Sequence, residues 1–170
     1  MNQSFKSAGG GADFDARDFR NALGSFATGV TVVTTVARDG KNVGLTCNSF
    51  SSVSLSPPLI LWSLSLHSPS LHAFLQAPFF AVNVLGADQL ALSQRFSTSL
   101  ANKFEGIEFT AGEEGVPLLG GALCHLECRN ETRHYSGDHV IFIGHVLRYA
   151  YRDGAPLVFW GGRYLQLDGS

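Results

Sequence analysis

A hydroxyl-rich segment covers residues 46–58 and has the sequence TCNSFSSVSLSPP. Five of the nine residues from Asn48 to Ser56 are serines, and a double proline follows them. At the end of a predicted strand, this composition places neutral hydroxyls and turn N–H groups where the chain leaves a sheet. Such a lining can hydrogen-bond a heteroaromatic ring edge, a polyol or a phosphate without fixing a charge. The alternative is a loop whose serines bond their own backbone.

Two further groups of polar residues have a spacing that suits ligand contact. Ser93, Arg95 and Lys103 lie at and just after a predicted helix end, where a hydroxyl and two cations can clamp a phosphate. His139 follows a Gly-Asp turn, and an imidazole at the mouth of a strand can bind a carboxamide or a phosphate, or transfer a proton. A solvated helix end and a packed strand histidine are the simpler alternatives.

Several familiar chemistries lack their residue patterns. Cys124, His125 and Cys128 resemble a metal cluster, but a strand rises about 3.3 Å per residue and therefore separates the two cysteines by about 13 Å. A zinc site is not expected. No G-x-S-x-G elbow, G-x-G-x-x-G loop or G-x-x-x-x-G-K-[ST] loop is present, so the common hydrolase and nucleotide-binding motifs are excluded. Trp160 and Tyr164 can stack on a planar ring, although core filling is the commoner use of aromatic residues.

The elements that must position these groups are mostly strands. Helices are predicted from an N-cap at Asp15 to about Gly29, from an N-cap and proline at Ser68-Pro69 to Gln76, and over residues 87–96. Strands are predicted at residues 30–36, 43–50, 59–64, 79–85, from 122 onward, at 139–149, and in a final hairpin of 156–160 with 164–167. Residues 97–119 are predicted to be a loop with one short strand. Many strands joined by short turns favour a closed or nearly closed antiparallel barrel.

Composition restricts the class of protein. The 170 residues suit one domain over 13–170 after a flexible tail at residues 1–12, and 45% hydrophobic content supports a real core. A formal net charge of −2 without a basic block argues against nucleic acid as a partner. No window approaches the roughly 18 consecutive apolar residues of a membrane span, and three cysteines fit a reducing compartment. A cytoplasmic protein without membrane contact is expected.

Taken together in chain order, five stretches resemble the flavin reductase family, the NAD(P)H-dependent partners of two-component flavin monooxygenases. The resemblance runs from Phe19 to about Leu167. Its carriers are FATGVTVV at 26–33, GLTCNSFSSVSLSPP at 44–58, FAVNVL at 80–85, GDH at 137–139 and GGRY at 161–164. Cys47 is a departure, because a small alanine is common there in the family.

The resemblance implies a mainly β fold with short helices, a split β-barrel of the FMN-binding, Greek-key type that forms a homodimer. It also implies a set of flavin contacts with the rings, the ribityl chain and the phosphate. By analogy these are Thr46, Asn48, Ser49, Ser51, Ser52, Val53, Ser54, Asn83, Val84, Ser93, Arg95, Phe96 and Lys103. His139 is similar to the family residue that meets the nicotinamide nucleotide, with Trp160 and Tyr164 as further candidates. No metal is implied.

The implied function is hydride transfer from NADH or NADPH to FMN or FAD, with reduced flavin leaving for a partner oxygenase. Such chemistry needs orientation and a polar cradle more than an acid–base pair. Neutral hydroxyls dominate the flavin-lining segment, so exchangeable flavin is expected. Two alternatives stay open at this point: a non-catalytic flavin-binding electron carrier of the same fold, and a barrel for another small ligand. The sequence alone does not choose between FMN and FAD or between NADH and NADPH.

Overall fold

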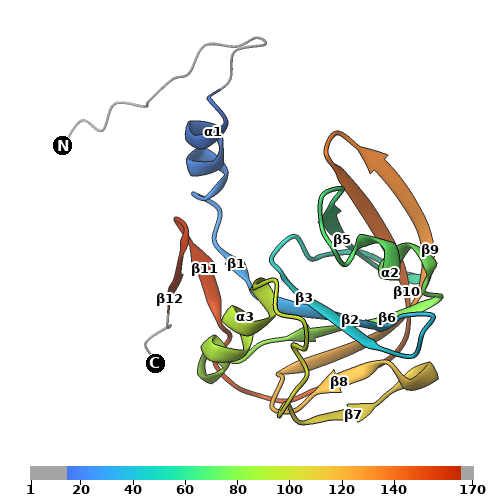
Figure 1. Ribbon diagram of the computed structural model, residues 1–170. Coiled ribbons are helices and arrows are strands. Elements are labelled where there is room, and N and C mark those ends of the chain that lie inside the picture. Colours follow the sequence, from blue (N-terminus) through green and yellow to red (C-terminus); the bar gives the residue numbers. More distant parts are fainter. Residues whose placement is uncertain (1–14, 166–170) are drawn as a thin grey trace.

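The computed structural model describes residues 15–165 as a mainly β protein (Figure 1). The predicted tail at residues 1–12 and the ends of the predicted final strand and domain lie outside the described residues. The helices are α1 (Ala16–Leu23), α2 (Leu71–Gln76) and α3 (Leu90–Ser97), with 3-10 turns at Ala87–Gln89 and Glu113–Gly115. No helix between residues 15 and 165 has the length and hydropathy that a membrane crossing requires.

One seven-stranded antiparallel sheet dominates the fold. Its spatial order is β3-β2-β6-β9-β10-β5-β4. The strands are β2 (Thr31–Val36), β3 (Asn42–Cys47), β4 (Ser51–Leu55), β5 (Pro58–Ser65), β6 (Phe79–Val84), β9 (Cys124–Ser136) and β10 (His139–Tyr151). The end strands β3 and β4 do not pair with each other, so the expected barrel is not closed by a backbone ladder within residues 15–165.

Two small sheets complete the topology. β1 (Thr28–Gly29), β11 (Val158–Trp160) and β12 (Arg163–Leu165) form a three-stranded sheet, and β7 (Phe109–Ala111) pairs with β8 (Pro117–Leu119). In Figure 1, the hairpin of β11 and β12 stands beside β1, and α1 projects beyond them. The predicted final hairpin is therefore confirmed over the described residues, with left-handed Gly161 and Gly162 (φ 58° and 79°) making the turn.

Two hydrophobic clusters lie on opposite faces of β2. In the larger one, Trp62 stacks on Phe142 with ring centroids 4.6 Å apart and meets the edge of Phe74 at 4.9 Å. Phe74 comes from α2 and is fully buried, so α2 covers this core. The smaller cluster contains Phe96 of α3 together with Val32 of β2, so α3 covers the other face. Burying a side chain of this size stabilises the fold by about 1.5–3 kcal/mol.

Two helix predictions need correction. Asp15 is the N-cap of α1, accepting from the backbone N–H groups of Arg17 and Asp18 at 2.8 Å, as predicted. The helix ends at Leu23 and not near Gly29, because the chain must extend by residue 28 to pair with β11. The second helix begins at Leu71, since the Ser68 side chain closes a turn on the N–H of Ser70 at 3.3 Å and does not cap the helix.

Two strand predictions were also wrong. The second arm of the first hairpin ends at Cys47 instead of Phe50, and residues 51–55 form β4, an edge strand paired with β5, where the sequence predicted only a loop. Residues 97–119 contain two short paired strands, not one. Serine and leucine alternation in SSVSL gives little burial contrast, and all five residues except Ser54 are exposed, so periodicity could not reveal this strand.

Candidate functional site

Three adjoining cavities surround the end of β3. They have volumes of about 490, 320 and 150 Å³, and Asn48 lines all three. Phe26 and Thr28 line the two larger ones, and Phe159 lines the largest and the smallest. Together they have the size of a cofactor or substrate site. Apart from Arg20 at the largest cavity, the lining combines aromatic rings with neutral groups, which suits a planar heteroaromatic ligand.

Segments from the two ends of the described chain build the wall of the largest cavity. Thr28 on β1 pairs with Phe159 on β11. The Trp160 indole N–H donates to the carbonyl of Ser25 at 3.2 Å, and the Gly161 N–H donates to the carbonyl of Gly24 at 2.9 Å. The β11–β12 hairpin therefore fixes the linker that joins α1 to β1. Sequence reasoning placed Trp160 near a ligand, and the structure places it on this wall.

A chain of hydrogen bonds crosses from β3 to the β11–β12 hairpin through α3. The Thr46 hydroxyl donates to the carbonyl of Ser93 at 2.6 Å, and the Ser93 and Tyr164 hydroxyl oxygens lie 2.9 Å apart. Ser93 is fully buried, and both Thr46 and Tyr164 line the smallest cavity. The structure thus brings together three residues that the sequence assigned to three separate groups.

Ser49 ties the open edge of the sheet. Its hydroxyl accepts from the N–H of Ser63 on β5 at 2.8 Å and donates to the carbonyl of the same residue at 3.1 Å. The Ser49 side chain thereby takes the place of one pair of backbone hydrogen bonds between the end of β3 and β5. Cys47 also contacts this hydroxyl, with its Sγ 3.0 Å from the Ser49 Oγ. Burial raises the pKa of the Cys47 thiol, so this group is a neutral wall residue.

The remaining serines of the segment lie on the edge strand β4. Ser51, Ser52 and Val53 are exposed, and the Ser51 hydroxyl bonds the adjacent carbonyl of Ser52 at 3.2 Å. The Ser54 hydroxyl accepts from the N–H of Ser56 at 3.2 Å. At Ser51 and Ser54 the structure agrees with the alternative in which the serines bond their own backbone. These hydroxyls lie outside the three cavities, and ligand contact by them stays a prediction.

Asn83 lies in the core and not at a cavity wall. It is fully buried, and its amide donates to the Val32 carbonyl at 3.0 Å and to the Thr34 hydroxyl at 3.1 Å. Its side-chain oxygen accepts from the N–H of Leu119 at 2.8 Å. The side chain therefore joins β2, β6 and β8. Its neighbour Val84 does line the 320 Å³ cavity.

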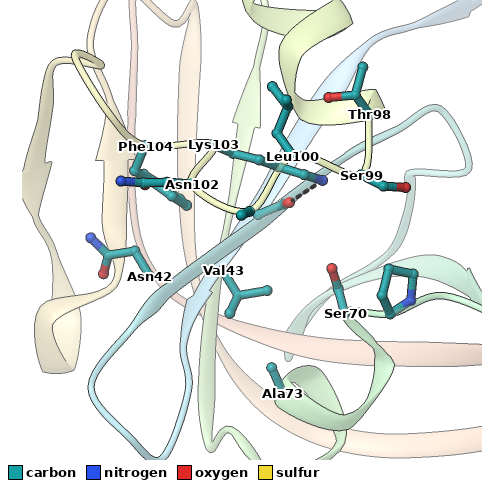
Figure 2. Close-up of a pocket in the computed structure, with 13 residues that line it drawn as sticks. Asn42, Val43, Ser70, Ala73, Thr98, Ser99, Leu100, Asn102, Lys103 and Phe104 are labelled. Carbon is teal, nitrogen blue, oxygen red and sulfur yellow. Dashed lines mark hydrogen bonds between the residues drawn. The ribbon is translucent and has the colours of Figure 1, made fainter.

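The four residues assigned to a phosphate contact lie in different parts of the structure. Ser93 belongs to the bonded chain described above, while Phe96 is fully buried in the smaller core. Arg95 donates to backbone carbonyls of the loop that follows α3. Lys103 lies in that loop and lines a separate cavity of about 280 Å³ (Figure 2). Sequence spacing alone could not separate these roles, because all four residues lie within a stretch of 11 positions.

His139 begins β10 directly after the tight turn. Its Nδ1 lies 2.7 Å from Oδ1 of Asp138, and this hydrogen bond lowers the pKa of the Asp138 carboxyl. His139 pairs with Ser65 on β5, two residues beyond the Ser63 that Ser49 bonds. The His139 side chain is 45% exposed, and the residue lines none of the three cavities around Asn48.

Sequence reasoning missed Thr28 and Phe26 as site residues. The Thr28 Oγ1 atom is buried and has no hydrogen-bond partner, which is uncommon for a hydroxyl in a finished interior. Thr28 lines both larger cavities. The signal was present in the stretch 26–33, which carried part of the family resemblance without a role for its threonine.

No group of three or more His, Cys, Asp or Glu side chains within residues 15–165 is arranged to hold a metal ion. Cys124 is half-buried and Cys128 is buried on β9. Burial raises the pKa of the Cys128 thiol to about 12, and the neighbouring Glu127 charge adds to this shift. A neutral thiol is a poor metal ligand.

Comparison with known proteins identifies the family. The flavin reductase like domain matches residues 23–168. FMN reductase (NADH) SmoA of Agrobacterium fabrum is 49% identical over 150 residues, covering 88% of this chain and 85% of that protein. The flavin-dependent monooxygenase reductase subunit HsaB of Rhodococcus jostii is 40% identical over 155 residues, covering 91% and 79%.

A solved structure gives the same result in three dimensions. The NADH:FAD oxidoreductase of Streptomyces globisporus, in complex with NAD and FAD fragments, superposes with a TM-score of 0.85 at 37% identity. The match covers 90% of this chain and 93% of that one. The domain match, the sequence identity and the shared fold agree, and the chain belongs to the flavin reductase family.

Proposed function

We propose that this protein is an NAD(P)H-dependent flavin reductase that reduces FMN or FAD and supplies the reduced flavin to a separate monooxygenase. The relatives named as NADH-dependent reductases and as reductase subunits of flavin-dependent monooxygenases support this function. The observation on the chain itself that carries the proposal is the group of adjoining cavities around Asn48, which aromatic and neutral polar side chains line.

The flavin ring and the nicotinamide ring are proposed to occupy different parts of these cavities. Asn48, Thr46 and Tyr164 offer amide and hydroxyl groups to the flavin, and Val84 supplies an apolar contact. The proposed contacts along the exposed segment are Ser49, Ser51, Ser52, Val53 and Ser54. Phe26 and Trp160 bound the largest cavity, where the nicotinamide ring can stack against the flavin and exclude water.

The side chains have little covalent chemistry to perform. A bound flavin supplies the hydride acceptor at its own ring, so the protein must bring the nicotinamide face to face with it. His139 is proposed to accept a hydrogen bond at Nε2 from an N–H or O–H group of the nicotinamide nucleotide, with Asp138 fixing the ring through the Nδ1–H at 2.7 Å. Neutral thiols at Cys47 and Cys128 do not compete as nucleophiles, because burial raises the pKa of each.

We also propose that the protein is a homodimeric split β-barrel that acts in the cytoplasm. Leu23 and Phe26 are 60% and 78% exposed, and Tyr149 and Tyr151 near the end of β10 are 70% and 76% exposed. Apolar and aromatic surface of this kind beside a cavity favours burial against a second copy. Light scattering after gel filtration tests this state, and a monomeric mass would contradict it. Three free cysteines support a reducing compartment.

The decisive experiment measures nicotinamide oxidation by the purified protein. NADH and NADPH are each combined with no flavin, FMN, FAD and riboflavin. Turnover that rises with added flavin is expected, and the eight combinations rank both substrates. A protein that binds flavin but oxidises neither nucleotide would instead be an electron carrier, and the reductase proposal would fail.

A further inference from the structure

Arg20 brings a charged side chain to the cavities around Asn48. It lies in the last turn of α1 and lines the cavity of about 490 Å³, together with Phe26 and Trp160. Within residues 15–165 the other residues that line the three cavities are neutral, and no Asp or Glu is among them. A guanidinium at a cavity without carboxylates favours an anionic group of a ligand.

The Arg20 guanidinium is free to bind a ligand. In the part of the chain that the structure describes, it forms no ion pair and donates no hydrogen bond. Two other arginines are already engaged: Arg163 lies over the Trp160 ring with Cζ 5.5 Å from the centroid, and Arg95 donates to carbonyls of its own loop. All five N–H donors of Arg20 are therefore available.

The backbone of Arg20 is tied to the hairpin that forms the cavity wall. Its carbonyl accepts from the N–H of Gly24 at 2.9 Å, and the Gly24 carbonyl accepts from the N–H of Gly161 at 2.9 Å. The carbonyl of Ser25 accepts from the Trp160 indole at 3.2 Å. None of the residues of α1 is buried, so these contacts with the β11–β12 hairpin hold the end of the helix beside the cavity (Figure 1).

We propose that Arg20 binds the pyrophosphate of the nicotinamide dinucleotide and thereby selects a dinucleotide as the hydride donor. The inference rests on the proposed function, which places the nicotinamide ring in the cavity that Phe26 and Trp160 bound. In NADH and NADPH a ribose joins that ring to the pyrophosphate, so two anionic phosphates follow the ring closely. The planar fork of an arginine matches two phosphate oxygens. Arg20 is the charged residue of this lining that can meet them.

The first measurement is binding of NAD⁺, which does not depend on turnover. The chain has two tryptophans, and Trp62 is fully buried in the larger core, so quenching of Trp160 fluorescence reports ligand in the cavity. In Arg20→Gln the dissociation constant of NAD⁺ should rise about tenfold, because a charge-assisted contact is lost. Arg20→Lys keeps the charge without the fork and should give a smaller rise. Added salt should weaken binding more in the wild type than in Arg20→Gln.

The second measurement compares hydride donors, with riboflavin as the acceptor so that no flavin phosphate takes part. Reduced nicotinamide riboside has the same ring and ribose as NADH but no phosphate. Its KM should be the same in the wild type and in Arg20→Gln. The KM values for NADH and NADPH should rise by a similar factor in this variant, because both donors carry the pyrophosphate.

Arg17 provides a matched control. It lies about one turn before Arg20 on the same helix, is exposed, and lines none of the three cavities. Arg17→Gln makes the same charge change and should leave the NAD⁺ constant and the KM values at their wild-type level. An equal loss in the two variants would overturn the proposal, since the net charge of α1 would then explain it. The exposed Arg20 side chain has no bond to lose, so Arg20→Gln should keep the wild-type urea midpoint.

Each remaining outcome overturns a different part of the proposal. If the KM for reduced nicotinamide riboside rises as much as that for NADH, Arg20 shapes the cavity and binds no phosphate. If only NADPH is affected, the contact is with the 2′-phosphate and not with the pyrophosphate. If FMN or FAD binding weakens relative to riboflavin while NAD⁺ binding is unchanged, the contact belongs to the flavin. Unchanged constants for every ligand would exclude Arg20 from binding.

The binding measurement also separates this inference from the function on which it rests. If NAD⁺ binding depends on Arg20 in a protein that oxidises neither NADH nor NADPH, the reductase function fails and the pyrophosphate contact stands. If the protein turns over NADH and Arg20→Gln changes neither binding nor KM, the reductase function stands and the contact fails.

Discussion

The hydroxyl of Ser93 on α3 lies 2.9 Å from the hydroxyl of Tyr164 on β12, although 71 positions separate the two residues in the sequence. Ser93 is fully buried, and its carbonyl also accepts the Thr46 hydroxyl. This contact joins the helix that covers the smaller core to the hairpin that forms the cavity wall. Folding stability and cavity shape are therefore coupled at this pair.

Replacing Tyr164 by Phe should destabilise the protein by about 1–3 kcal/mol, because the buried Ser93 hydroxyl loses its partner. Urea unfolding without added flavin measures the change. Ser93→Ala combined with Tyr164→Phe should recover part of the loss, since the double variant leaves no unpaired hydroxyl. Fully additive losses would show that the contact is not formed in solution.

Asn83 is expected to matter more for stability than for flavin binding. Asn83→Ala removes three buried hydrogen bonds and should cost about 3 kcal/mol of unfolding free energy. Asn48→Ala is the matched control, because Asn48 is exposed and lines the cavities. It should weaken flavin binding with little change in urea midpoint. A weakened flavin affinity without a loss of stability in Asn83→Ala would return Asn83 to the binding site.

His139→Ala should raise the KM for NADH about threefold to tenfold, more than it raises the KM for flavin, because one hydrogen bond to the nucleotide is lost. The hydrogen bond from His139 lowers the pKa of Asp138, so its carboxylate stays ionised as the pH falls toward its usual range and keeps holding Nδ1. Asp138→Asn should show a smaller change of the same sign. Steady-state kinetics with each substrate varied in turn measure both KM values. An equal effect on the two KM values would contradict a nucleotide role.

The thiols should react slowly in the folded protein. Burial raises the pKa of Cys47, and that of Cys128 reaches about 12, so less thiolate is present at pH 8 than for a free cysteine. Iodoacetamide labelling followed by mass spectrometry should show protection at pH 8, a rate that rises with pH above 9, and full labelling in guanidinium. Rapid modification of Cys47 at pH 8 would contradict the neutral, buried thiol.

Flavin is expected to exchange with solution. The described cavity residues around Asn48 are aromatic or neutral except for Arg20, so no strong ion pair fixes the ring system. Gel filtration of the protein loaded with FMN should separate the protein from the flavin. Absorbance in the visible region shows which fractions contain the flavin. Flavin that stays with the protein through gel filtration and dialysis would contradict this expectation.

Residue patterns predicted most of the sheet and missed what depends on tertiary contacts. The β-branched run at 30–36 and the alternation from residue 122 identified strands, because burial on a sheet face selects those residues. β4 escaped because an exposed edge strand carries no such contrast. Ser68 looked like a helix cap, but its side chain closes the preceding turn, and local sequence does not distinguish these two uses of serine.

The site was predicted as a set of residue types, and the structure determines which of them share a cavity. Arg95 and Lys103 both looked like phosphate ligands, since each is a cation near a helix end. Only the fold shows that the guanidinium is bonded to carbonyls of the loop that carries the lysine. Thr28 had no distinguishing local feature, because its role depends on β11, about 130 positions later.

The pairing of residues near position 25 with residues near position 160 also sets when the cavity exists. The Trp160 and Gly161 contacts to Ser25 and Gly24 span 135 and 137 positions. During synthesis the cavity wall at residues 24–25 cannot form until residues near 160 have emerged. Contacts between residues so far apart in the sequence form slowly. Leu157 belongs to the smaller core, with Phe159 and Tyr164 packed against it, so that core and the cavity wall are completed by the same late segment. Ligand binding therefore requires the segment near residue 160 to be folded in place, and flavin can stabilise only chains that have folded this far.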